Sequence, residues 1–323
     1  MNSNDLITIV FQGPIVNFKG INVTKKAIET SMKIFPNSEI ILSTWENETL
    51  SDLNHLPIKI ILNEDPGSGL RKYNPKTYHN VNRIIVSSIN GIKAATNELV
   101  IKCRSDIIFK NNNSIEFFDK FHDYNNEITF LDQRVVVSNQ TSINVKYGPP
   151  LLYHLCDWFY LGTKADLIKI FDIKLMPSEY ENYYNYFEKP ENKIDVNNLS
   201  RYMAEDYITS TFLNKYTKIS HDYYCEYTDF EHLKFEKILA NNFIVVDNVR
   251  LGIYANKYHN LSKKYLWKSY TFFEWIQIYY KYAAKNNKHK LHDFDRLILF
   301  ILNPIQSFRY FYTLLFKKGY KNI

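Results

Sequence analysis

Cysteine is scarce in this chain, with three among 323 residues. Cys103, Cys156 and Cys225 are scattered and form no Cys-x-x-Cys pair. This pattern excludes a disulfide framework and a cysteine-rich zinc site, and it is typical of a protein in a reducing compartment. Glycine and proline are also few, at 9 and 10 residues, whereas 45% of the residues are hydrophobic. We therefore expect a globular chain with a sizeable core and not a disordered one.

Long apolar runs are absent as well. No segment reaches the roughly 20 apolar residues that span a bilayer, and the nearest candidate, residues 297–302, is followed at once by Asn303 and Pro304. The first five residues lack the basic region of a secretion signal, and no nucleic-acid-binding motif is present. We therefore expect a cytoplasmic protein that has no membrane span and no nucleic-acid partner.

The net charge of +6 is unevenly distributed along the chain. Residues 257–323 carry 13 Lys and Arg against 3 Asp and Glu, whereas residues 1–256 carry 27 against 31. The basic segment is rich in aromatic residues, and helical spacing predicts one apolar face made of Ile305, Phe308, Tyr312 and Leu315. Such a helix is typical of a segment that lies on an anionic membrane surface. The alternative is a helical hairpin that packs in the core and keeps its lysines in water.

The first hundred residues alternate between strand and helix patterns. Apolar runs of strand length lie at residues 6–11, 39–42, 58–62 and 99–101, and helical spacing of apolar residues lies at 24–34 and 81–92. This alternation predicts an α/β fold with a mostly parallel sheet flanked by helices. Ligands of such sheets bind at the carboxyl ends of the strands.

Small or polar residues follow each of the four predicted strands. They are Gln12-Gly13-Pro14, Ser43-Thr44-Trp45-Glu46, Asp65-Pro66-Gly67 and Arg104-Ser105-Asp106. In the last of these, the carboxylate of Asp106 could hold a divalent cation while the guanidinium of Arg104 faces phosphate oxygens. That pairing indicates a sugar-nucleotide site, and the alternative is a structural Arg–Asp pair at the end of a strand.

Six short motifs follow one another between residues 6 and 215. They are Phe11-Gln-Gly-Pro-Ile15, Phe35-Pro-Asn-Ser-Glu-Ile-Ile-Leu-Ser-Thr-Trp-Glu46, Asn63-Glu-Asp-Pro-Gly67, Asn82-Arg83, Lys102-Cys-Arg-Ser-Asp106 and Asp157-Trp-Phe-Tyr-Leu-Gly162. Together they resemble the WavE lipopolysaccharide-synthesis family. The resemblance implies a glycosyltransferase of the GT-A type, whose Rossmann-like half binds a nucleotide-sugar. It divides the chain into a donor half at about 1–110, an acceptor half at about 111–256, and a helical, basic and aromatic extension at 257–323.

The resemblance also implies roles for residues of the donor half. The donor would contact Gln12, Gly13, Pro14, Thr44, Asp65, Asn82, Arg83, Arg104 and Asp106. Asp106 lies where the family type has an Asp-x-Asp metal motif, so it would bind Mg²⁺ or Mn²⁺, with His259 as an added ligand. Arg104 replaces the first acid of that motif. For Arg83 the alternative is a surface position on its helix, and for the Gln12 and Asp65 segments it is an ordinary turn.

Candidate acceptor and catalytic residues come later in the chain. Asp132 and Arg134 follow a predicted strand at 128–131, and Asp157 and Trp158 lie within the last of the six motifs. Trp158 could stack on a sugar ring or pack in the core. Glu205 and Asp206 open a predicted helix, where acids commonly complement the helix dipole. The resemblance implies that one of this pair, Asp206 before Glu205, is the base that deprotonates the acceptor hydroxyl.

The sequence thus predicts a glycosyltransferase of bacterial lipopolysaccharide, lipooligosaccharide or capsule synthesis. Its substrates would be a nucleotide-sugar and a lipid-linked saccharide, met at the cytoplasmic face of the inner membrane. One alternative is a nucleotidyltransferase, although Gln12-Gly13-Pro14 with Lys19 and Gly20 is a poor version of its glycine-rich loop. Another is a catalytically degenerate binding subunit, which the replacement of an acid by Arg104 would favour.

Overall fold

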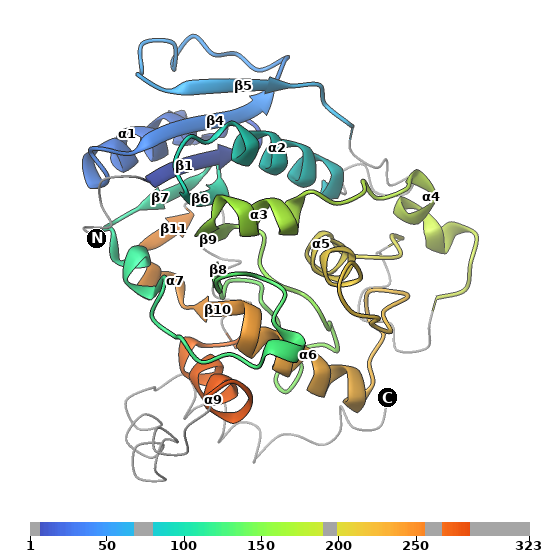
Figure 1. Cartoon of the computed structure of the whole chain (residues 1–323). Coiled ribbons are helices and arrows are strands. Elements are labelled where there is room, and N and C mark those ends of the chain that lie inside the picture. Colours follow the sequence, from blue (N-terminus) through green and yellow to red (C-terminus); the bar gives the residue numbers. More distant parts are fainter. Residues whose placement is uncertain (1–6, 68–79, 190–198, 256–266, 285–323) are drawn as a thin grey trace.

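A seven-stranded sheet forms the centre of the molecule (Figure 1). The computed structural model describes residues 7–67, 80–189, 199–255 and 267–284. The strand order is β10-β8-β9-β6-β1-β4-β5, and among these strands β9 alone runs antiparallel to its neighbours. The strands are β1 (Ile7–Gln12), β4 (Glu39–Trp45), β5 (Lys59–Asn63), β6 (Leu99–Arg104), β8 (Val135–Ser138), β9 (Phe159–Thr163) and β10 (Phe243–Val246).

Helices cover both faces of the sheet, as the alternating pattern predicts. The chain leaves β1 through α1 (Val23–Ile34) to reach β4 on one side, and it returns from β5 through α2 (Val81–Ala94) to β6 on the other side. Because parallel crossovers are right-handed, these opposite directions place α1 and α2 on opposite faces. α2 packs closely on β1 and β4, and α3 (Lys164–Phe171) packs beside it on β9.

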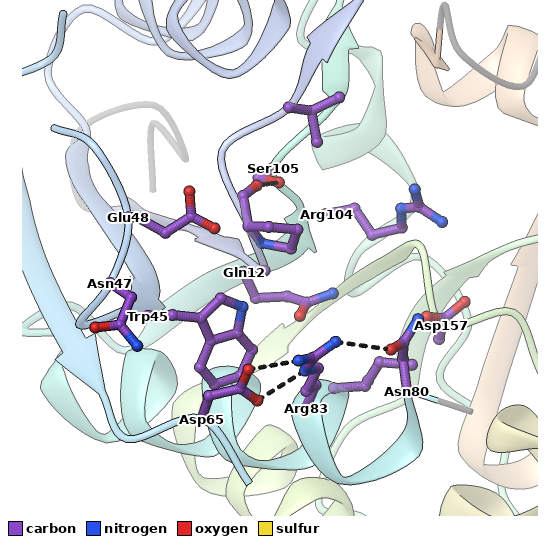
Figure 2. Close-up of a pocket in the computed structure, with 14 residues that line it drawn as sticks. Gln12, Trp45, Asn47, Glu48, Asp65, Asn80, Arg83, Arg104, Ser105 and Asp157 are labelled. Carbon is purple, nitrogen blue, oxygen red and sulfur yellow. Dashed lines mark hydrogen bonds and ion pairs between the residues drawn. The ribbon is translucent and has the colours of Figure 1, made fainter. Parts of the chain in front are cut away.

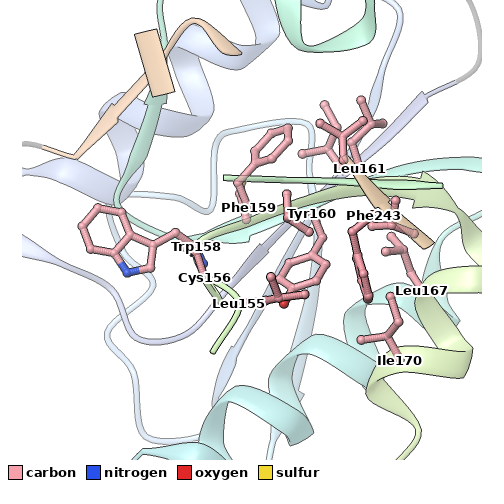
Figure 3. Packing of buried hydrophobic residues seen from close by; sticks show 14 of the residues in the cluster. Leu155, Cys156, Trp158, Phe159, Tyr160, Leu161, Leu167, Ile170 and Phe243 are labelled. Atoms are coloured by element: carbon pink, nitrogen blue, oxygen red, sulfur yellow. Dashed lines mark hydrogen bonds between the residues drawn. The ribbon is translucent and has the colours of Figure 1, made fainter. Parts of the chain in front are cut away.

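The core lies on both sides of the central strands (Figure 3). All but one residue of β9 are buried, and Tyr160 packs edge-on against Phe171 of α3 while Phe159 packs against Phe109. Parallel sheets that are covered on both faces have nearly continuous apolar strands, which explains the short apolar runs of this sequence.

The C-terminal described helix, α9 (Phe272–Tyr282), is part of this core. A capping box of Thr271 and Glu274 begins it, and it packs on α6 (Asp229–Asn242) and β10. Trp275 is completely buried. The aromatic side chains on the buried face of α9 therefore pack in the core, as the alternative interpretation of the basic segment predicts, and do not form an exposed membrane-binding face. The predicted helix face at 305–315 and His259 lie outside the described residues.

The remaining elements are short or peripheral. They are β2 (Asn17–Phe18), β3 (Ile21–Asn22), β7 (Ile107–Phe109), β11 (Ile253–Ala255), α4 (Ser178–Glu181), α5 (Ala204–Leu213), α7 (Asn248–Leu251) and the 3₁₀ turns η1 (Asn113–Phe117), η2 (Asn126–Ile128) and η3 (Tyr183–Asn185). In the described part of the chain, every helix is too short or too polar to cross a bilayer.

The strands and helices predicted within the first hundred residues are confirmed to within a few residues at their ends. The strand predicted at 128–131 is wrong, because Ile128 ends a 3₁₀ turn and β8 begins only at Val135. Asp132 and Arg134 therefore precede a strand instead of following one. β8 runs in the same direction as β6, so these two residues lie at the edge of the sheet opposite to the carboxyl ends of β1 and β6.

Candidate active site

A cavity of about 490 Å³ opens at the carboxyl ends of β1, β4, β5 and β6 (Figure 2). The loops after these strands, the start of α2 and the residue two before β9 contribute its walls. It is lined by Gln12, Gly13, Pro14, Val16, Trp45, Asn47, Glu48, Asp65, Asn80, Arg83, Ile84, Arg104, Ser105 and Asp157. Its position is the one where α/β sheets bind ligands.

The turn after β1 forms the floor of the cavity. Gly13 has a φ of +107°, which strongly favours glycine, and its N–H donates to the carbonyl of Ser43 at 3.0 Å. The N–H of Ser105 donates to the carbonyl of Gln12 at 2.9 Å, and the Ser105 hydroxyl donates to the carbonyl of Pro14 at 2.5 Å. The turn is thus tied to both neighbouring strands, and it has no Cβ where the backbone bends.

The first of two guanidinium groups at the cavity belongs to Arg83, on the first turn of α2. Its Nε and Nη2 donate to the two carboxylate oxygens of Asp65 at 2.7 and 2.5 Å. The Arg83 hydrogen bond holds the pKa of Asp65 below its usual value, and the N–H of Gly67 also bonds this carboxylate. Both side chains are about 30% exposed, so the pair faces the cavity.

The second guanidinium group, that of Arg104, is held from two sides. Its Nε and Nη2 donate to the two oxygens of Asp106, each at 3.0 Å, and its Cζ lies 4.9 Å from the centre of the Trp158 ring. Asp106 is 1% exposed, whereas Arg104 is 21% exposed. A planar guanidinium held by a bidentate carboxylate and an aromatic ring is fixed in orientation. Trp158 is therefore a support for Arg104 within the core.

These contacts do not fit Asp106 as a metal ligand in this arrangement. Both of its oxygens accept from Arg104, and the side chain does not line the cavity. In the described ranges, no three His, Cys, Asp or Glu side chains lie close enough together to share a metal ion. The geometry of Arg104 and Asp106 is that of an Arg–Asp pair at the end of a strand, which is the alternative interpretation of this motif.

A group of acid–base side chains interacts electrostatically with Asp157, which lines the cavity. Glu205, on the first turn of α5, accepts from the Thr141 hydroxyl at 3.3 Å, and its Oε2 lies 3.6 Å from Nε2 of His154. The Glu205 side chain is 19% exposed and that of His154 is 8% exposed. Burial raises the pKa of Glu205, His154 lowers it and the carboxylate of Asp157 raises it further.

The backbone of Asp157 is held by a buried lysine. Lys102 of β6 has no exposed surface, and its ammonium donates to the carbonyl oxygen of Asp157. Burial lowers the pKa of Lys102 to about 8, and the negative charge of Asp157 opposes that shift. Lys102 thus fixes the Asp157 backbone to the end of the central strand, and in its charged form it places a cation beneath this side of the cavity.

Asp206 has a different environment from its neighbour Glu205. Its Oδ2 lies 2.9 Å from Nε2 of His221, and both side chains are fully buried. Among the described residues, neither the other carboxylate oxygen nor Nδ1 of His221 has a hydrogen-bond partner. Glu205 is therefore the member of the acidic pair that solvent and a substrate can reach.

Comparison of the sequence with known families gives one match. The family described as WavE lipopolysaccharide synthesis matches residues 7–306. The chain belongs to the WavE family. The match extends well beyond the six motifs and includes the acid–base group, the buried Asp206–His221 pair and α9. The search of curated proteins gives no match.

Several solved structures resemble this WavE protein weakly. A 4-diphosphocytidyl-2C-methyl-D-erythritol synthase from Anaerococcus prevotii is 12% identical, with a TM-score of 0.34 over 66% of this chain and 99% of that one. HddC from Yersinia pseudotuberculosis is 14% identical, with a TM-score of 0.32 over 56% and 86%. A cytidylyltransferase from Leptospira borgpetersenii is 12% identical, with a TM-score of 0.31 over 68% and 90%. Scores this low carry no argument about activity.

The structure brings fewer than half of the predicted site residues of this WavE protein to the cavity. Seven of them line it: Gln12, Gly13, Pro14, Asp65, Arg83, Arg104 and Asp157. Thr44 is fully buried and does not line the cavity, and Asn82 bonds the backbone of Met176 with both ends of its amide.

The two candidate acceptor residues before β8 do not reach the cavity. Asp132 is an exposed partner of Lys169 at 2.8 Å. The buried Arg134 donates to the backbone carbonyls of Ala240, Phe121 and Asp123. Their prediction rested on a misplaced strand, so the structure gives Arg134 a role in holding the fold together.

Sequence reasoning missed several lining residues of the WavE cavity, among them Trp45, Glu48 and Asn80. The predicted strand stopped at the end of its apolar run, whereas β4 continues for three more residues, through the buried polar residues Ser43 and Thr44. Trp45 is the last residue of this strand, and Glu48 lies in the loop after it. Burial raises the pKa of Glu48. Asn80 lies directly before α2, a position that could have been inferred from the helix pattern. His154 had no detectable signal, because it lies in an irregular loop.

Proposed function

We propose that this protein is a glycosyltransferase that moves a sugar from a nucleotide-sugar to a lipid-linked saccharide during bacterial lipopolysaccharide, lipooligosaccharide or capsule synthesis. Membership of the WavE lipopolysaccharide-synthesis family supports the biosynthetic setting. The observation that carries the proposal is the cavity at the carboxyl edge of the sheet, which two oriented guanidinium groups line. Asp157, which also lines it, interacts electrostatically with Glu205 of the acid–base group.

The guanidinium groups suit the departing half of a nucleotide-sugar. When the bond between the anomeric carbon and the diphosphate breaks, the electron pair stays with the diphosphate oxygen and negative charge accumulates there. Arg83 and Arg104 are held in place by Asp65 and Asp106, so little reorganisation is needed to stabilise that charge. Removing one such oriented donor typically costs about 10²- to 10³-fold in rate.

The acceptor hydroxyl needs a base, and Glu205 is the better-placed acid of the predicted pair. Its carboxylate would accept the hydroxyl proton while the oxygen forms its bond to the anomeric carbon. A base with a raised pKa takes up that proton more readily, and burial of Glu205 supplies the shift. This proposal reverses the predicted order of Asp206 before Glu205, because Asp206 is enclosed against His221.

A divalent ion, Mg²⁺ or Mn²⁺, stays a prediction for this reaction. Such an ion would neutralise the departing diphosphate when bound. Both oxygens of Asp106 accept hydrogen bonds from Arg104, and His259 lies outside the described residues.

The proposal is tested by incubating the full chain with a panel of nucleotide-sugars and a truncated lipopolysaccharide acceptor. We expect the acceptor to gain the mass of one sugar and a nucleoside diphosphate to be released. Arg83→Ala should lower this turnover about 100-fold, whereas Lys93→Ala, at the exposed far end of the same helix, should leave it unchanged.

Two other outcomes would contradict the proposal. Release of pyrophosphate from a nucleoside triphosphate and a sugar phosphate would identify a nucleotidyltransferase. Nucleotide binding without turnover on the native acceptor would identify a degenerate binding subunit.

A further inference from the structure

His154 stands between a backbone carbonyl and the carboxylate of Glu205. Its Nδ1 lies 2.8 Å from the carbonyl oxygen of Thr141, and its Nε2 lies 3.6 Å from Oε2 of Glu205. The His154 side chain is 8% exposed and that of Glu205 is 19% exposed. His154 is therefore the more enclosed member of the pair.

The carbonyl of Thr141 decides which ring nitrogen carries a hydrogen. A carbonyl oxygen only accepts, so Nδ1 must donate and must hold a proton in every charge state that keeps this bond. A neutral His154 then presents the lone pair of Nε2 to a carboxylate that has only lone pairs to offer. That contact is repulsive without a proton and attractive with one proton between the two groups.

We infer that Glu205 and His154 form a proton-sharing dyad, in which His154 is a positioning residue that holds the proton Glu205 removes from the acceptor. This inference deepens the proposed function and rests on it. The base form of the dyad is ionised Glu205 facing neutral His154. When the acceptor hydroxyl attacks, Glu205 takes its proton and shares it with Nε2 of His154 once the 3.6 Å separation from Oε2 shortens to hydrogen-bond length. The acceptor oxygen bonds the anomeric carbon as the bond from that carbon to the diphosphate oxygen breaks, and the electron pair leaves with the diphosphate.

The charges around the dyad act in opposite directions. The carboxylates of Asp157 and Asp206 both raise the pKa of Glu205, and so favour retention of the proton. The positive charge of Lys102 faces Asp157 from beneath and weakens that influence. The buried hydroxyl of Tyr160 also interacts with Glu205. Thr141 adds a neutral hydrogen bond to Oε1, which keeps the carboxylate oriented.

The dyad is tested without substrate by NMR of ¹⁵N-histidine-labelled full chain. The His154 signals are assigned by their loss in His154→Asn. We expect Nδ1 to be protonated across the pH range and the His154 titration to move to lower pH in Glu205→Gln, because the carboxylate that retains the shared proton is gone. Asp206→Asn is the matched control on the same helical turn. It should change the signals of His221 and move the His154 titration much less than Glu205→Gln does, because Asp206 acts on the dyad through its charge alone.

Turnover supplies the second measurement. Glu205→Gln should lower the rate by about 10²- to 10⁴-fold, and His154→Asn should shift the ascending limb of the pH–rate profile to lower pH while reducing its plateau. A His154 titration that is the same in wild type and Glu205→Gln would overturn the dyad even if sugar transfer is observed. If the titration moves but no nucleotide-sugar is turned over, the proposed function fails and the proton-sharing pair stands.

Discussion

At the scale of single residues, the two arginines of the cavity are oriented by carboxylates. On the sequence alone, these carboxylates, of Asp65 and Asp106, are expected to contact the donor or a metal ion. The Arg104-Ser105-Asp106 motif was placed correctly at the end of a central strand, but the side chain that reaches the cavity is Arg104. Spacing alone could not decide this, because β6 continues through Arg104 and the next turn directs Asp106 inward. Asp65 similarly orients Arg83.

The Asp106→Asn variant distinguishes two roles for Asp106, which are orienting Arg104 and binding a metal ion. The amide replaces one accepting oxygen by a donating NH2 group, so the bidentate pair with the guanidinium is lost. We expect the free energy of unfolding to fall by about 1–3 kcal/mol and the nucleotide affinity to fall with it. Both losses should be equal in EDTA and in Mn²⁺, measured by denaturant unfolding and by calorimetric titration. A loss that appears in Mn²⁺ alone would show that Asp106 binds the ion.

At the scale of elements, the close contact of α2 with the sheet positions Arg83. Gly91 faces the sheet, and a Cβ there would lie 2.4 Å from Cγ1 of Val10 and 3.0 Å from Cβ of Ser43. The absence of a side chain thus lets the helix approach β1 and β4. The helix pattern predicted α2 correctly, whereas this need for glycine became visible only once the sheet order was known.

Gly91→Ala tests the contact. Overpacking of this kind typically costs about 1–3 kcal/mol, and the better helix propensity of alanine returns at most about 1 kcal/mol. We expect a lower melting temperature and a weaker nucleotide affinity, because α2 and Arg83 must move outward together. Lys93→Ala on the exposed end of the same helix should change neither, and a Gly91→Ala variant as stable as wild type would contradict the packing argument.

At the scale of the whole molecule, the sequence predicted the layers and the edge that holds the cavity, because alternating apolar segments dictate both. It failed where the chain is irregular. Because a strand was predicted at 128–131, Asp132 and Arg134 were assigned to the wrong edge of the sheet. The end of β4 was predicted too early, because its last residues include buried polar side chains. The acid–base group is assembled from α5 and the irregular connection between β8 and β9, so no local sequence pattern predicts His154.

The uneven distribution of charge along the chain predicts binding to a membrane surface. We propose that the basic segment beyond α9 brings the protein to an anionic membrane surface, where a lipid-linked acceptor resides. The full chain should cosediment with anionic vesicles at low salt and less at high salt. Lys317→Glu with Lys318→Glu should weaken this binding, whereas Lys25→Glu with Lys26→Glu on α1 should not. Equal binding to neutral vesicles would contradict the proposal.

The most direct test of the account is a calorimetric titration of nucleoside diphosphates into the full chain and into Arg104→Ala. If the cavity at the carboxyl edge is the donor site, at least one nucleoside diphosphate binds to wild type with one site per chain. Its dissociation constant should rise about 10- to 100-fold in Arg104→Ala, the loss expected for a charge-assisted hydrogen bond. Equal affinity in the two proteins would place the nucleotide elsewhere and would contradict the central claim.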